Sequence, residues 1–429
     1  MPRARGANAL MAIGFEIDPG VPPASGFHLV PFVSANLGET QGLVASDVLG
    51  FGRDPQQPGR DVIENAGDVV VPMCARNIGY WLKMLFGDPT TTAGLAATGS
   101  LTFSAQPANN ATITIGGQAF TFVSGTPTAN QIKIGATLAE TIGHAVRTLN
   151  ASVVAGVAAA TYRGDARGAR IDISHDAIGT SGNAMTLAAG SSPASNATVS
   201  GSTLAGGSAS GAYNHVFITG AQTLPSASIE VGMPEVPSFG MNWGIKANTL
   251  GIPLQRGGNL NATLGLIGQG ETRAGSTAAG TPDALDMMRF SSFAGLARRL
   301  GVPIGDLVSG QFNVSNGLDP VPAIRGDGRI SGVDEGMLAV TGQVGVRYSG
   351  QEFQDLAENG AATELEFGWT IPNTIFALRS LVHSVYLPKS KLPITGPTGI
   401  QADYAWQAAE APGLGRTATI TLVNDVASY

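Results

Sequence analysis

Four segments of the chain alternate apolar and polar residues with a period of two, and this pattern constrains the fold more than any other feature. The segments are 259–266, 338–347, 364–367 and 417–422. A period of two places successive side chains on opposite faces of a β-sheet. Leu, Val, Ala, Ile and Phe take one face, whereas Asn, Thr, Gln and a few charged residues take the other. We therefore expect a mainly β chain with its sheets packed as a sandwich or barrel.

The polar face of these segments is the candidate functional surface. An antiparallel sandwich with one hydrated face would explain it without any special role. The alternative is that the polar face lines a channel shared by several subunits. The candidate residues are Asn259, Asn261, Thr263, Thr341, Gln343, Arg347, Glu364, Glu366, Thr417, Thr419 and Thr421.

The composition favours a chain whose surfaces are largely covered by neighbours. Only 13% of the 429 residues are charged, and 59 are Gly. A chain with so few charges supplies little solvated surface of its own. The net charge of −7, with no Lys/Arg run longer than Arg298-Arg299, argues against tight binding of nucleic acid, although DNA could still pass without being gripped.

Targeting and cysteine signals are weak. No stretch of eighteen apolar residues is present, so no transmembrane anchor is expected. Residues 1–15 resemble a signal peptide only faintly and are interpreted as an N-terminal arm. A single cysteine, Cys74, excludes a disulfide scaffold.

Composition divides the chain into three zones. Residues 95–210 are rich in Ala, Gly, Ser and Thr, and are bounded by the linker-like stretches 90–94 and 205–211. Within this zone, 112–115 and 119–124 alternate like strands, and Thr137 to Glu140 form a capping box before a helix. We expect 1–94 and 211–429 to form one discontinuous core domain and 95–210 to be a small inserted α+β domain.

Local signals predict a few further elements in the outer zones. A helix is expected over 78–86, between Asn77 and Gly87, and a hairpin over 245–267. A second helix is expected over 282–300, because Pro282 follows a possible cap and apolar residues recur at helical spacing. Residues 349–361 are expected to form a long loop.

No pattern in the sequence supports an active site. Phosphate-loop, zinc-protease and nucleophile-elbow motifs are absent, and the five histidines are scattered. His175-Asp176 is weak evidence for a metal, and Cys74 has no identifiable base. Glu364 and Glu366 resemble a catalytic carboxylate pair, but no aromatic platform accompanies them. We expect no enzyme activity and no catalytic, metal or cofactor-binding residue, and a carbohydrate-active β-sandwich enzyme is kept as an alternative.

The order of short motifs in the outer zones resembles the major tail tube proteins of long-tailed, siphovirus-like bacteriophages. The insert resembles a small module of phage tail and sheath proteins. One departure is Asp334-Glu335-Gly336, where the family pattern has Pro before the Gly. The motifs that carry the resemblance are 30–32, 68–72, 79–87, 224–232, 316–319, 324–328 and 422–427.

The resemblance implies a structural virion protein with no cofactor. Six subunits would form a ring, and rings would stack into a tail tube that conducts the genome into the host cell. About four strands per subunit would build a continuous inner β-barrel. About 24 strands at ~4.8 Å spacing and ~40° tilt give a backbone diameter of about 50 Å, wide enough for duplex DNA to pass.

The same resemblance implies partners and an alternative. The partners would be further copies, a tail terminator, a tape measure protein and distal tail proteins, in a virion whose proteins are made in the bacterial cytoplasm. A sheath or decoration protein is the alternative. Within the tube we expect Glu364 and Glu366 to repel DNA. Arg347 is expected either to line the channel or to pair with one of these glutamates. The 349–361 loop is expected either to contact the next ring or to be an ordinary solvated loop. The insert is expected to face outward.

Overall fold

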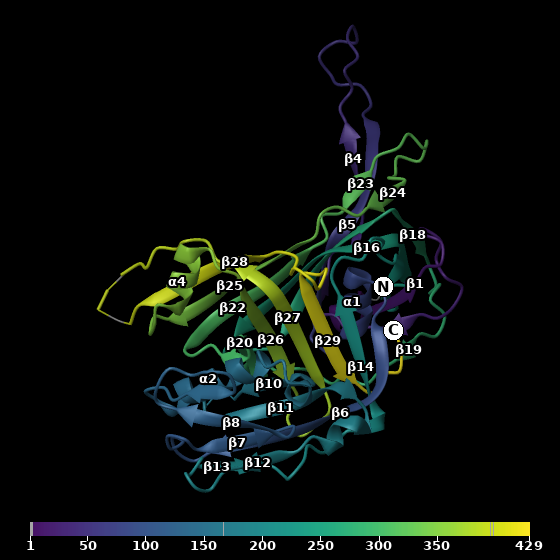
Figure 1. Cartoon of the computed structure of the whole chain (residues 1–429). Coiled ribbons are helices and arrows are strands. Elements are labelled where there is room, and N and C mark those ends of the chain that lie inside the picture. The colour runs from purple at the N-terminus through teal and green to yellow at the C-terminus, as the bar shows by residue number, and fades with distance from the viewer. Residues whose placement is uncertain (1–2, 166, 395, 398) are drawn as a thin grey trace.

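The fold was analysed in a computed structural model that describes residues 3–165, 167–394, 396–397 and 399–429. It is mainly β, as expected, with a β-sandwich above a smaller α+β unit (Figure 1). A long arm projects from the sandwich on the side away from that unit.

One layer of the sandwich, called here the first sheet, consists of six antiparallel strands. Alternating apolar residues on each strand turn toward the second layer, which is the expected behaviour of a sheet buried on one face. The strands, in spatial order, are β5 (Gly59–Pro72), β17 (Asn261–Gly268), β16 (Ser238–Gln255), β22 (Leu307–Ser315), β25 (Ala339–Arg347) and β28 (Gln401–Ala408).

The other layer, the second sheet, also has six strands. Its only strand pairing with the first sheet joins the ends of β27 and β28, at Val385↔Ala408 and Tyr386↔Gln407, among the residues described. The strands, in spatial order, are β20 (Gly295–Arg299), β26 (Thr363–Thr370), β27 (Ala377–Tyr386), β29 (Ala418–Asn424), β14 (Ser208–Ile218) and β6 (Thr90–Phe103).

The main core lies between the two sheets. Phe312 of the first sheet packs against Phe367 of the second at 6.0 Å between ring centroids, and Phe367 stacks on Trp406 of the first sheet at 5.8 Å. All three rings are buried, so the inner faces of the two sheets are in direct contact. The outer faces therefore point in opposite directions.

Helix α1 (Ile78–Phe86) closes one end of this core, where it was expected. All of its residues except Lys83 are buried. The helix ends at Gly87, whose φ of 87° is accessible to glycine at little cost.

A smaller sheet and several short elements flank the sandwich. The amino-terminal half of β16 leaves the first sheet and pairs with β15 and β18, and β1 continues beyond β15. The arm is a hairpin of β4 with the first part of β5. The flanking elements are η1 (Gly6–Asn8), β1 (Leu10–Phe15), β2 (His28–Leu29), β3 (Ser34–Ala35), β4 (Gly38–Val44), β15 (Ala227–Met233), β18 (Gly270–Ala274), β19 (Asp283–Ala284), η3 (Ser292–Ala294), β21 (Val302–Pro303), β23 (Asp319–Val321), β24 (Gly332–Asp334) and α4 (Glu352–Asn359).

The smaller unit has a hydrophobic core of its own, drawn from Ala97 to Leu204 and including Phe120, Phe122 and Tyr162. The capping box forms as expected: Thr137 accepts from the Glu140 N–H, and Glu140 accepts from the Thr137 N–H. The elements of this unit are β7 (Thr112–Ile115), β8 (Gln118–Val123), β9 (Gln131–Lys133), α2 (Leu138–Asn150), α3 (Ala155–Ala158), β10 (Ala160–Gly164), β11 (Arg170–Ile178), η2 (Thr180–Ala184), β12 (Leu187–Ala189) and β13 (Ala197–Val199).

The stretches interpreted as linkers belong largely to strands, because 90–94 lies in β6 and 208–211 begins β14. Thr90 to Ala93 pair with β14 in the second sheet, and the same strand β6 then pairs with β11 in the smaller unit. Gly94, with φ of 114°, and an irregularity in β14 between Ser208 and Tyr213 let the strands bend at the junction. Gly and Thr thus mark a bend in a shared strand.

Two further local expectations were wrong. Residues 282–300 contain the short strand β19, one 3-10 turn and strand β20, because pairing of Gly295–Arg299 with β26 outweighs a helical spacing of apolar residues. The expected loop 349–361 contains helix α4, anchored where Phe353 stacks on Tyr404 at 5.4 Å and ended by Gly360 at φ 61°.

Candidate functional site

The outer face of the first sheet carries two continuous rows of residues without a charge. In the first row, Val70, Thr263, Gly251, Asn313, Thr341 and Gln407 face one another across all six strands. In the second row, Pro253, Gln311, Gln343 and Ala405 lie side by side. All ten are exposed or half-buried. The rows form a polar, neutral strip that spans the sheet.

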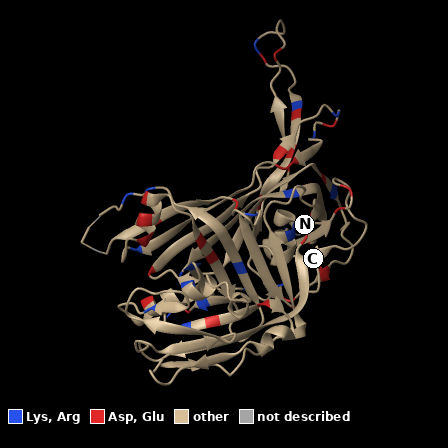
Figure 2. Ribbon diagram, in the orientation of Figure 1, with Lys and Arg blue, Asp and Glu red and all other residues tan. Residues whose placement is uncertain are grey.

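The amide side chains of this strip bond to one another. Gln311 donates from Nε2 to Oδ1 of Asn313 at 3.0 Å. Charges are confined to the margins, where Asp68 and Asp403 lie on the rows beyond the strip and Arg347 lies at the end of β25. Figure 2 shows the same distribution: charges gather on the arm, on α4 and beside the smaller unit, and the strands between them are largely uncharged.

Five of the eleven candidate residues lie on this face: Asn261, Thr263, Thr341, Gln343 and Arg347. Asn259 is exposed just before β17 begins. The neighbours Gln311, Asn313 and Gln407 were missed. Their strands β22 and β28 also alternate, so the same period-two search over 307–315 and 401–408 would have found them.

The other five candidates, Glu364, Glu366, Thr417, Thr419 and Thr421, belong to the second sheet. Their apolar neighbours fill the same core, so these side chains point away from the polar strip. Thr419 bonds to Nε2 of His383 at 2.8 Å, and Thr421 is paired with Arg379 across the strands. The expectation that one surface carries all eleven residues is wrong, because alternation fixes a face within a sheet and leaves the sheet unspecified.

Glu366 is buried beneath the smaller unit, with 3% of its surface exposed. Its carboxylate bonds Arg163 of that unit at 2.7 Å and Arg298 of β20 at 2.9 Å. Burial would raise the pKa of Glu366, but Arg163, Arg298 and Arg379 outweigh it and hold that pKa below its usual range. A carboxylate enclosed in this way cannot repel a passing polyanion, so the role expected of Glu366 is wrong.

Glu364, two residues away on the same strand face, shows the opposite shift. Burial and the nearby charge of Glu366 raise its pKa. It lines a cavity of about 600 Å³ together with Arg147 and Tyr162 of the smaller unit. Arg347 pairs with neither glutamate, because its Nη1 donates to the Gly399 carbonyl at 2.6 Å.

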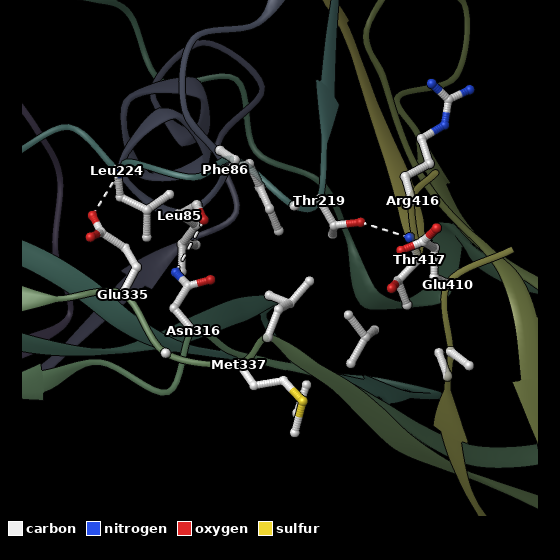
Figure 3. Close-up of a pocket in the computed structure, with 18 of the residues that line it drawn as sticks. Leu85, Phe86, Thr219, Leu224, Asn316, Glu335, Met337, Glu410, Arg416 and Thr417 are labelled. Carbon is white, nitrogen blue, oxygen red and sulfur yellow. Dashed lines mark hydrogen bonds between the residues drawn. The ribbon is translucent and has the colours of Figure 1, made fainter. Parts of the chain in front are cut away.

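A groove of about 690 Å³ opens where the ends of the two sheets meet near α1 (Figure 3). Glu335 accepts from the Leu224 N–H at 2.8 Å and pairs with Lys246 at 2.7 Å. Burial alone would raise the pKa of Glu335, but these two contacts lower it. On the other side, Thr219 accepts from the Thr417 N–H at 3.0 Å. The labelled Glu335, Asn316 and Thr219 side chains have partners within the protein, whereas the buried Nε of Arg416 has none among the described residues.

Three of the motifs quoted for the resemblance, 79–87, 316–319 and 422–427, meet at or next to α1. Asn316 donates to the Leu85 carbonyl at 3.1 Å and to the Ala247 carbonyl at 2.9 Å. Asn424 donates to the Ala75 carbonyl at 2.8 Å. Gly336 lies against Gly317 so closely that a Cβ would sit 2.1 Å from the Gly317 oxygen, which explains this glycine without a preceding proline. These three motifs thus supply hydrogen bonds at and next to one helix, whereas 324–328 is exposed and its Gly328 carbonyl accepts from the Ile63 N–H on the arm.

Residues 3–165, 167–394, 396–397 and 399–429 contain no group of three or more His, Cys, Asp and Glu placed to hold a metal ion. In the same ranges, no helix is long and apolar enough to cross a membrane.

These features define a class of protein. The chain is a structural β-protein whose conspicuous site is a flat polar strip on a sheet. A family model described as "Phage tail tube protein" matches residues 6–234 and 203–408, and the chain therefore belongs to the phage tail tube protein family. This is a structural family of the phage tail, which makes the chain a virion tail component. No curated protein matches the chain.

Proposed function

We propose that copies of this chain form hexameric rings that stack into the tail tube and conduct the genome into the host cell. The observation that carries the proposal is the neutral polar strip across the first sheet. A surface of Thr, Asn and Gln holds water and offers no cation to a phosphate, so DNA can move past it. No catalytic step is part of this function.

The edges of the first sheet support ring closure. Only Gln407 and Ala408 of β28 pair on the side away from β25, among the described residues. Residues 401–406 therefore leave a row of backbone groups open on that side. At the opposite end, β3 covers Val69 and Val70 of β5, and β4 pairs only with β5 within the described residues. The open edges of β28 and β4 favour pairing with neighbouring copies, which would extend the polar strip around a ring.

The number of strands that the polar strip spans affects the diameter of the proposed tube's bore. The expectation was about four strands per copy, whereas the polar face spans six. If all six entered the wall, six copies would supply about 36 strands and a backbone diameter of about 70 Å, against about 50 Å for 24 strands. Either bore admits duplex DNA, which is roughly 20 Å across.

The arm formed by β4 and β5 supports axial stacking. Leu43, Leu49, Phe51 and Val62 lie on it with more than half of their surfaces exposed. Apolar side chains on a projecting hairpin would be buried if the arm lay on the next ring. We propose a second contact with the next ring at residues 349–361, where α4 carries Glu352, Asp355 and Glu358.

The smaller unit is proposed to face outward. It covers the outer face of the second sheet, and the polar strip lies on the opposite side of the sandwich. If the strip lines the bore, the insert 95–210 is on the tube exterior. The core domain 1–94 and 211–429 would then form the wall.

Several finer expectations belong to the same proposal. The tube would contact a tail terminator, a tape measure protein and distal tail proteins, and the chain would be made in the bacterial cytoplasm. A sheath or decoration protein is the second candidate, and the insert's resemblance to a module of sheath proteins favours it.

Electron microscopy of the purified chain at high concentration tests the proposal. We expect hollow tubes of stacked rings, with six copies per ring in an averaged reconstruction and Thr263 and Gln343 on the bore. Solid filaments, or rings with Thr263 and Gln343 on the exterior, would overturn it. A wide cylinder that assembles only around a preformed tube would favour the sheath alternative.

A further inference from the structure

A cleft of about 830 Å³ separates the smaller unit from the outer face of the second sheet. One wall comes from β6, β11 and residues 200–206, and the other from β20, β26 and β27. Four arginines line it, and two of them, Arg298 and Arg379, come from the sandwich. The walls therefore belong to the two separate hydrophobic cores.

The charges in this cleft do not balance. Arg170 pairs with Asp172 at 2.8 Å. Asp165 accepts from the backbone N–H groups of Ala169 and Arg170, each at 2.9 Å. Arg163 and Arg298 share the single carboxylate of Glu366. After these pairings, Arg379 is the guanidinium left over.

Arg379 has no hydrogen-bond or ion-pair partner among the described residues, although it is only partly exposed. A Cβ built on Gly368 would lie 3.8 Å from Cγ of Arg379 and 4.0 Å from Nη1 of Arg298, so both arginines flank the space above this glycine. Burial, with the charge of Arg163, lowers the pKa of Arg379 to about 10. The nearby charges of Glu366 and Asp172 act in the opposite direction on this pKa but do not offset the burial.

We propose that this cleft binds an oxyanion, a sulfate, phosphate or carboxylate group, through Arg379, with Arg298 and Arg163 beside it. A guanidinium presents parallel N–H donors that match two oxygens of such a group. Hydroxyl groups of Ser100, Ser174 and Thr370 also line the cleft and can serve the remaining oxygens. An oxyanion would supply the negative charge that the chain itself lacks at this place.

The anion would link the two units. Arg163 belongs to the smaller unit, whereas Arg298 and Arg379 belong to the second sheet. The group has two possible sources, a free ion or the carboxylate of an adjacent copy. The cleft lies within one chain, so the site does not depend on tube formation and can fail or hold independently of it.

Titration calorimetry on the unassembled full-length chain tests the site. Sodium sulfate or inorganic phosphate is added against sodium chloride at constant ionic strength. We expect saturable binding of one oxyanion per chain. Arg379→Gln should weaken it at least tenfold, and Arg379→Lys less, because the charge is kept and the paired donors are lost. Arg347→Gln, a change on the opposite sheet, should bind as the wild type does.

A second variant distinguishes loss of the binding site from misfolding of the chain. Gly368→Leu fills the space between Arg298 and Arg379 and keeps every charge, so it should also abolish binding. Near-ultraviolet circular dichroism reports whether each variant is folded. Absence of saturable binding in the wild type, or equal binding by folded Arg379→Gln, would overturn the proposal.

Repeating the titration on assembled tubes identifies the source. Loss of sulfate binding on assembly would assign the site to a carboxylate of an adjacent copy. Retained binding would assign it to a free ion. Both results support an oxyanion site.

Discussion

The outer faces of the two sheets began as the same pattern and ended in different environments. Both come from strands that alternate apolar and polar residues, and both turn their apolar side toward one core. The face of the first sheet is open and uncharged over two rows. The face of the second is covered by the smaller unit and holds Glu366 among three arginines. Alternation therefore specifies which side chains point away from the core. The packing of the rest of the chain determines whether those side chains face solvent or another part of the protein.

The largest effect on stability is expected when the buried Glu366 carboxylate is removed from the outer face of the second sheet. Glu366→Ala leaves Arg163 and Arg298 without their carboxylate, and removing one partner of a buried pair lowers stability by about 3–5 kcal/mol. Urea unfolding measures this loss. Glu352→Ala removes the exposed partner of Arg299 and should change stability by no more than about 1 kcal/mol. Equal losses in the two variants would contradict the contrast between the faces.

Deleting most of the covering unit separates its role from that of the sheets. A chain in which a short Gly/Ser link replaces residues 96–207, with Glu366→Gln and Arg379→Gln to neutralise the uncovered face, should still assemble into tubes. Electron microscopy gives the result, and the full-length double variant is the control. Tubes from the control but none from the deletion would show that the insert 95–210 takes part in building the wall.

Adding charge to the open face should change passage and leave the fold intact. Thr263→Lys with Gln343→Lys places two cations per copy on the strip, where each can contact a phosphate. Genome release should slow severalfold and become more sensitive to salt, while stability changes by less than about 0.5 kcal/mol. Release kinetics from purified virions at two salt concentrations measure this. Thr128→Lys, on the exposed surface of the smaller unit, should release DNA at the normal rate.

The smallest effect concerns the pH dependence of two neighbouring carboxyls. The pKa of Glu366 is lowered on folding, so its contribution to stability is present above the unfolded pKa and is lost as pH falls through the folded pKa. The pKa of Glu364 is raised, so its contribution is present below the unfolded pKa and is lost as pH rises through the folded pKa. Glu364→Gln should therefore stabilise the chain slightly at neutral pH. Thermal unfolding at pH 4 and pH 7 measures both signs, and a Glu364→Gln variant less stable than the wild type at pH 7 would contradict this assignment.

Sequence reasoning succeeded where the deciding interactions are local. The helix Ile78–Phe86 and the capping box at Thr137 depend on residues within one or two turns of each other. It failed at 282–300, where pairing with β26 replaces the helix, and at 90–94, where a distant strand turns a Thr- and Gly-rich stretch into part of a sheet.

The candidate surface divides in the same way. Period two identified Thr263, Thr341 and Gln343 as outward-facing, because that depends only on the strand itself. The burial of Glu366 depends on Arg163, about two hundred residues earlier in the chain, and no local pattern encodes that contact. Thr417, Thr419 and Thr421 lie on the second sheet for an equally non-local reason, because alternation fixes a face within a sheet and leaves the sheet itself unspecified.

Strand β6 begins in the sandwich and ends in the smaller unit without a break in its backbone. β6 is hydrogen-bonded to β14 in the sandwich and to β11 in the smaller unit. Because both units share this strand, the smaller unit is held in one orientation relative to the sandwich. In the proposed tube every smaller unit would therefore stand at one fixed angle to the wall. The smaller units would then form a regular helical pattern on the outside of the tail. A force applied to one of them would be transmitted directly to the ring that carries it.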